Sequence, residues 1–117
     1  MGGGLSKDQP GILKTFIQAI LRKLKELGFW TMYVNADNDI FKNVIRMFVA
    51  LAYVPVDEVH AAFNILSRHA MNMYPDDGRY GDLPISPFIT YFMNTWMGPN
   101  GGAGGKFKLQ FWNVRES

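Results

Sequence analysis

The sequence contains no cysteine, which excludes a disulfide framework and any metal centre ligated by thiolates. It also lacks an apolar run of the roughly 18 residues that a membrane-spanning helix needs. The N-terminus has no apolar signal-peptide core either, because glycines and the pair Lys7-Asp8 stand in its place. Together these absences predict an intracellular protein, in the cytoplasm or the nucleus.

Net charge is also small, at +2 over 117 residues, and by itself does not indicate a nucleic-acid partner. The charge is unevenly placed, however. Residues 1–28 hold five basic and two acidic groups, a net charge of +3, so the rest of the chain carries −1. The basic character is therefore concentrated near the N-terminus.

What the chain has in abundance is hydrophobic and aromatic residues, which make up 48% and 15% of it. Apolar positions recur three and four residues apart, the period of an amphipathic helix. We expect an all-α fold in which one domain at residues 10–117 follows a flexible leader at 1–9. The predicted helices cover residues 10–27, 38–53, 56–70 and 87–97, followed by a glycine-rich loop at 98–106 and an extended segment at 107–114.

Proline and glycine predict where these helices begin and end. Pro55 lacks an amide hydrogen and disfavours helical geometry at the residue before it, so the chain must turn between the second and third helices. Pro10 is expected to start the first helix, and Gly28 is its expected left-handed cap. Ser86-Pro87 is the expected opening of the last helix, with the serine as cap.

The connection between the first two predicted helices is short and aromatic. Residues 29–35 read FWTMYVN, which is too apolar for a linker, and we expect an extended or irregular piece packed onto the core. Asp37 or Asn38 is the expected cap of the helix that follows.

No group of residues has the spacing of an active site. The glycine-rich run at 101–106 lacks the first glycine and the hydroxyl residue of a phosphate-binding loop, and no predicted strand precedes it. His60 and His69 are nine residues apart on one predicted helix, so they lie on opposite faces and cannot share a metal. A contact between His60 and Asp57 would be an ordinary surface pair. We therefore predict no enzyme activity, no cofactor, no metal site and no small-molecule substrate.

The first residues fit the N-myristoylation pattern, in which Gly2 would receive the lipid. One acyl chain gives only weak, reversible membrane binding, so a second signal is needed. A basic stripe on the first helix is a candidate for that signal and, alternatively, for contact with nucleic-acid phosphates. The simpler alternatives are a flexible leader and a solvated helix face. The stripe consists of Lys7, Lys14, Arg22 and Lys25.

The C-terminal segment mixes aromatic and basic side chains, a combination that can bind single-stranded nucleic acid by stacking. The alternative is that the aromatic residues pack against the helices while the basic residues face water. We favour this second interpretation. The residues concerned are Phe107, Lys108, Phe111, Trp112 and Arg115.

Several stretches stand in a distinctive order along the chain: FIQAILRKLKELG at 16–28, RMFVALAYVPVDEV at 46–59, YFMNTWMG at 91–98 and FWNV at 111–114, with Tyr33, Phe41 and Ala62-Phe63 between them. In order and spacing they resemble the later part of Mutator-like (MULE) transposases. Animal relatives of that domain often accompany FLYWCH-type zinc fingers. The resemblance covers about residues 11–116.

Such transposases have an RNase H-like catalytic domain whose metal-binding Asp, Asp, Glu set is interrupted by a helical insertion before the final Glu. The resemblance implies that this chain corresponds to the insertion alone. The catalytic aspartates would lie upstream of Met1 and the final glutamate beyond Ser117, since Glu116 does not match its context. The Cys-x-x-His pair of the family is replaced here by Ile12 and Thr15. The resemblance therefore implies a chain that does not cleave DNA.

The function we predict is that of a non-catalytic, transposase-derived helical module that binds a protein partner. Its apolar excess suits protein contact better than its slight charge suits DNA. The alternatives are an N-myristoylated peripheral membrane adaptor, which would bind an anionic membrane surface, and a nucleic-acid-binding module.

Overall fold

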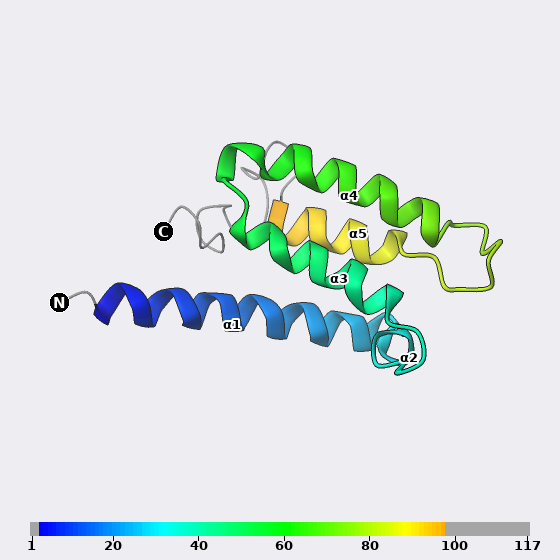
Figure 1. Cartoon of the computed structure of the whole chain (residues 1–117), viewed down its shortest axis with the longest axis horizontal. Helices are drawn as coiled ribbons and strands as arrows, with labels where there is room; N and C mark the ends of the chain where they lie inside the picture. The colour runs from blue at the N-terminus through cyan, green and yellow to red at the C-terminus, as the bar shows by residue number, and fades with distance from the viewer. Residues whose placement is uncertain (1–2, 98–117) are drawn as a thin grey trace.

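The computed structural model of the chain describes residues 3–97, and the side chains from residue 13 onward. Every regular element in this range is helical, which confirms the all-α prediction (Figure 1). The α-helices are α1 (Gly3–Glu26), α2 (Trp30–Tyr33), α3 (Ile40–Ala50), α4 (Val59–Met73) and α5 (Ser86–Phe92). The predicted loop at 98–106 and extended segment at 107–114 lie outside the described residues.

The first helix begins at Gly3, so the predicted start at residue 10 is wrong. Residues 3–9, which the sequence assigned to the leader, have helical backbone. Pro10 lies inside the helix rather than in its first turn. Inside a helix a proline removes one hydrogen bond and its ring crowds the carbonyl four residues back, so the helical backbone of residues 3–9 forms despite this cost.

α1 ends as predicted at Gly28, which has a φ angle of +86°. The Gly28 amide donates to the Lys25 carbonyl at 3.2 Å, and the Phe29 amide donates to the Leu24 carbonyl at 2.8 Å. This pair of bonds is the Schellman motif, which satisfies the last carbonyls of a helix. Phe29 and Leu24, the two residues that such a motif brings together, are both buried.

α2 replaces the extended or irregular piece predicted at residues 29–35, and that prediction is wrong. The Tyr33 amide donates to the Phe29 carbonyl and the Val34 amide to the Trp30 carbonyl, each at 3.0 Å, which closes a single helical turn. The rings of Trp30 and Tyr33 stack with centroids 5.4 Å apart. One turn is too short to produce a periodic pattern in the sequence.

The turn at Pro55 divides α3 from α4, as predicted. Val54 and Pro55 have extended ψ angles of 141° and 139°, and short 3₁₀ turns lie on either side, at Leu51–Tyr53 and Val56–Glu58. The predicted helices at 38–53 and 56–70 are therefore partly 3₁₀ in character near the corner, and α4 continues to Met73. The N-cap of α3 is Asp39, which makes no side-chain cap bond, so the predicted cap at Asp37 or Asn38 is wrong. Asn38 Oδ1 instead accepts a hydrogen bond from the Ile40 amide at 3.0 Å, in the turn just before the helix.

The last predicted helix, 87–97, consists of α5 and a π-helical turn at Met93–Met97. Ser86 is the first helical residue and makes no side-chain cap bond, so its predicted capping role is wrong. Pro87 lies in the first turn as expected, where the missing amide hydrogen costs nothing.

Aromatic rings form the centre of the core, and α5 contacts three other helices through them. Phe92 packs against Phe16 of α1, with ring centroids 6.0 Å apart, and against Phe63 of α4 at 5.7 Å. Phe88 packs against Phe48 of α3 at 5.3 Å. Figure 1 shows the resulting arrangement, with α1 along one side, α4 along the other, and α3 and α5 between them. Each such aromatic pair contributes about 0.5–1.5 kcal/mol beyond the burial of its area.

Candidate functional site

An apolar groove of about 510 Å³ lies between α3 and α4. Met47 of α3 and Ile65 of α4 are large apolar side chains on this groove, and they are 48% and 67% exposed. Leu51 and Leu66 are buried and also line it. The remaining lining residues are Ala62 and His69 of α4.

The groove exists because α4 carries more apolar surface than its core face needs. Val59, Phe63, Leu66 and Ala70 form the buried stripe. Ala62, Ile65, Leu66 and His69 form a second stripe at the i, i+3, i+4, i+7 spacing of one helix face. Apolar side chains left uncovered beside a complete core are typical of an interaction surface.

Charged residues flank this stripe in the sequence. Glu58 is exposed one turn before Ala62, at the Pro55 corner. Arg68 and Arg46 are exposed and stand next to His69 and Met47 in the sequence, and none of these three charged residues lines the groove.

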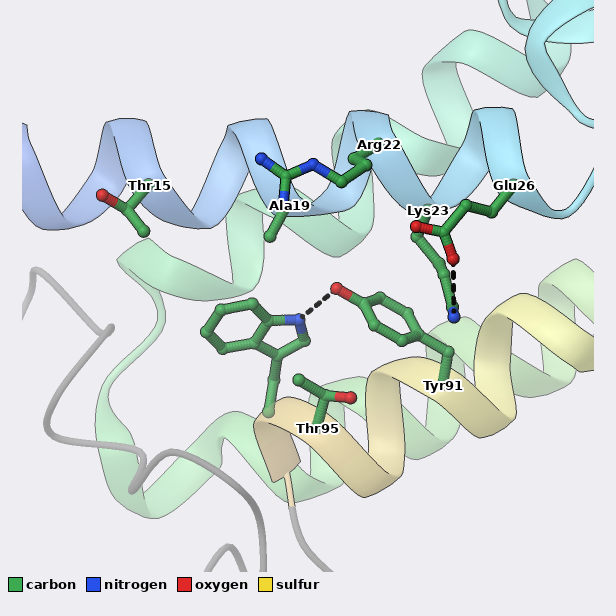
Figure 2. Close-up of a pocket in the computed structure, with 8 residues that line it drawn as sticks. Thr15, Ala19, Arg22, Lys23, Glu26, Tyr91 and Thr95 are labelled. Carbon is green, nitrogen blue, oxygen red and sulfur yellow. Dashed lines mark hydrogen bonds and ion pairs between the residues drawn. The ribbon is translucent and has the colours of Figure 1, made fainter.

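A second cavity, of about 410 Å³, lies between α1 and the region of α5 and the π-helical turn (Figure 2). Its lining mixes charged and hydroxyl-bearing side chains with aromatic ones, in contrast to the groove on α3 and α4. Its lining residues are Thr15, Ala19, Arg22, Lys23 and Glu26 from α1, with Tyr91, Thr95 and Trp96 from the other side.

The π-helical turn determines the geometry on the α5 side of this cavity. The Trp96 indole Nε1 donates a hydrogen bond to the Tyr91 hydroxyl at 3.1 Å, drawn as a dashed line in Figure 2. Residues five apart in a regular α-helix are offset by roughly 140° around the axis, which separates their side chains. The π turn at Met93–Met97 winds fewer degrees per residue than an α-helix, which reduces this offset between Tyr91 and Trp96.

The pKa of Tyr91 is raised above 10.0, mainly because burial disfavours the charged phenolate. The nearby Glu26 carboxylate raises it further, while the hydrogen bond from Trp96 and the charge of Arg22 lower it. Tyr91 is therefore a neutral phenol at physiological pH.

Opposite charges are partly paired on the α1 side of the cavity. Lys23 Nζ lies 3.2 Å from Glu26 Oε1 and 5.1 Å from the centroid of the Tyr91 ring. Arg22 is exposed and forms no ion pair within the described part of the chain. Figure 2 shows its guanidinium extending back over Ala19 toward Thr15.

The predicted basic stripe is exposed along α1 wherever its side chains are described. Lys14, Arg22 and Lys25 all face solvent, and Lys25 Nζ also lies 4.5 Å from the centroid of the Trp30 ring. Arg22 of this stripe lines the cavity between α1 and α5. The side chain of Lys7 lies outside the described residues, as do Gly2 and the C-terminal aromatic and basic residues.

The predicted pair of His60 and Asp57 is not formed. Asp57 is exposed, and the buried Nε2 of His60 has no hydrogen-bond partner. No group of three or more His, Asp or Glu side chains that would hold a metal occurs among residues 13–97. None of the helices described combines the length and the apolar content needed to cross a bilayer.

No family model matches this sequence, and no curated protein or solved structure matches it either. The resemblance to Mutator-like transposases therefore stays a prediction.

Sequence reasoning missed both the groove and the Tyr91–Trp96 pair. The groove did leave a signal, because Met47 and Ile65 are large apolar residues outside the stripes that form the core. The pair left none, because a spacing of five residues has no meaning in a regular α-helix and the π turn has no sequence pattern of its own.

Proposed function

We propose that this chain is a non-catalytic protein-interaction domain, and that the groove between α3 and α4 binds an amphipathic helix of a partner protein. The observation that carries the proposal is the exposure of Met47 and Ile65 on either side of a hollow with an almost entirely apolar lining. The resemblance to the helical insertion of Mutator-like transposases supports a role without catalysis.

The shape of the groove favours a helical occupant. Two neighbouring helices present a channel into which the ridge of a third helix fits, and helix-in-groove binding uses anchors at i, i+3 or i+4, and i+7. The stripe from Ala62 to His69 is roughly 10 Å long, which corresponds to two turns of a bound helix. Met47 adds an unbranched thioether side chain that adapts to different partner surfaces.

The proposal is tested by photo-crosslinking in the source cell. The photoreactive residue p-benzoylphenylalanine replaces Met47, and the crosslinked peptides are identified by mass spectrometry. We expect a peptide from another protein with apolar residues at helical spacing. The crosslink is lost in an Ile65→Glu variant, because a carboxylate in the groove is desolvated without a partner.

The matched control places the same photoreactive residue at Leu83, a loop side chain that is 46% exposed and lies outside the groove. Equal labelling from Leu83, a product that persists with Ile65→Glu, or the lack of any Met47-specific product contradicts the proposal. A crosslink between two copies of this chain also overturns the assigned occupant, and replaces it by self-association.

A further inference from the structure

The cavity between α1 and α5 presents hydrogen-bond donors that the described residues leave unused. The Tyr91 hydroxyl accepts the Trp96 indole N–H, but its own proton has no acceptor among the described residues. Since one lone pair of the oxygen is engaged by Trp96, the hydroxyl group is held in place on the cavity wall. Tyr91 is thus a fixed neutral donor on a half-buried surface.

Arg22 supplies the second donor group. It lies one turn before Glu26, but that carboxylate pairs with Lys23 instead, so the guanidinium has no anionic partner among the residues with described side chains. Four factors shift the pKa of Tyr91, and in decreasing order they are burial, the hydrogen bond from Trp96, the charge of Glu26 and the charge of Arg22. The guanidinium and the phenol therefore lie close enough to interact electrostatically. A planar guanidinium binds carboxylates and phosphates through two parallel hydrogen bonds.

The charge of the lining distinguishes between these anions. Arg22 and Lys23 carry two positive charges and Glu26 one negative charge, so the cavity carries a net charge of +1. The charge of a single carboxylate matches this value. A doubly charged phosphate would be repelled by Glu26, and the lining offers no further cation to balance its second charge. The small side chain of Ala19 leaves room between the helices, and about 410 Å³ is enough for a small organic molecule.

We propose that this cavity is a binding site for a small organic carboxylate, which Arg22 binds through its guanidinium and Tyr91 through its hydroxyl. Thr95 adds a hydroxyl group on the same side as Tyr91. The site is separate from the groove on α3 and α4, and it differs from the expectation from the sequence that the chain has no small-molecule ligand. The two proposals stand independently, because they share no lining residue.

The test is a titration of the ¹⁵N-labelled chain with 3-phenylpropionate, followed by two-dimensional NMR. The Trp96 indole N–H is the reporter, because its acceptor is the hydroxyl that would contact the ligand. We expect this signal to shift in a saturable way. Two further compounds serve as probes. The neutral amide 3-phenylpropanamide has the same shape without the charge, and inorganic phosphate is a different anion.

Two variants assign the donors. Arg22→Gln removes the charge and is expected to weaken binding about tenfold. Tyr91→Phe keeps the ring and removes the hydroxyl, with a similar loss. Lys14→Gln is the matched control, since Lys14 is an exposed basic residue of the same helix that does not line the cavity.

Specific outcomes contradict the proposal. Binding of the amide as tight as that of the carboxylate would show that the charge is not recognised, and tighter binding of phosphate would assign a different anion. An equal effect of Lys14→Gln would reduce the result to general attraction by α1. The lack of any saturable shift of the Trp96 signal in the folded protein would remove the site.

Discussion

The two sides of this molecule share one core but differ in what they leave exposed. On the α3–α4 side, the residues beyond the core stripes are apolar and line an open groove. On the α1–α5 side, the residues beyond the core are charged or hydroxylated and line a cavity. Phe92 packs against rings from α1 and α4 alike, so both surfaces rest on the same support. The two sides differ in the helix faces that the core does not cover, rather than in the core itself.

The largest effect is expected from a substitution of Phe92, the residue that supports both surfaces. Phe92 is fully buried, and replacing it by alanine leaves a cavity among the surrounding rings. We expect Phe92→Ala to lower the free energy of unfolding by about 3–5 kcal/mol, measured by urea denaturation. The NMR signals of both surfaces should change together. A change confined to one side would show that the two surfaces do not depend on a common core.

A substitution with a smaller effect should change the α1–α5 side and leave the α3–α4 side unchanged. Tyr91→Phe leaves the Trp96 N–H without its acceptor in a site where the indole is only 3% exposed. An unsatisfied buried donor costs about 1–3 kcal/mol, so we expect a loss of stability in this range. Signals around the cavity should shift, while those of Met47 and Ile65 should stay in place. Movement of the groove signals would mean that the sides are coupled.

The same variant changes the dependence of stability on pH. Burial raises the pKa of Tyr91 in the folded state, so its contribution is fully present below the unfolded value of 10.0 and is lost as the pH rises through the folded pKa. Tyr74 shifts in the same direction, mainly through burial and secondly through Asp82. Wild-type stability should therefore fall above pH 10, and Tyr91→Phe should show a shallower decline.

The smallest expected effect concerns the end of α1. Gly28 has a φ angle of +86°, and an added Cβ there meets no atom within 4 Å, so the penalty of Gly28→Ala is conformational rather than steric. We expect a loss of about 1 kcal/mol. Amide hydrogen exchange should accelerate at the end of α1 and in α2 but not in α4. Unchanged exchange in α2 would show that the Schellman motif does not hold that turn.

Most of the fold was predictable because its signals are local. The apolar period predicted α1, α3, α4 and α5, Pro55 predicted the corner, and Gly28 predicted the end of α1. The start of α1 was not predicted because a proline inside a helix is disfavoured and is favoured in the first turn, so Pro10 indicated a start that the structure does not have. α2 was missed because one turn produces no period.

The candidate sites were less predictable. The exposure of Lys14, Arg22 and Lys25 follows from helical spacing, and the structure agrees. The chemistry around Arg22 does not follow from it, because Tyr91 and Trp96 come from a distant part of the chain and meet Arg22 only through tertiary packing. Met47 and Ile65 were visible as surplus apolar residues, but their meeting in one groove depends on how α3 and α4 cross.

The π-helical turn makes the α1–α5 side sensitive to chain length. A π turn wraps one more residue than the α-helical turn it replaces. Deleting a single residue from Met93–Met97 would return the segment to regular helix and change the position of Trp96 relative to Tyr91. The Trp96 indole would then no longer donate to the Tyr91 hydroxyl, so the cavity wall would lose its fixed hydroxyl group. The sequence and spacing of α3 and α4 would not change. A one-residue length change in this segment is thus a route by which homologous chains would lose one surface and retain the other.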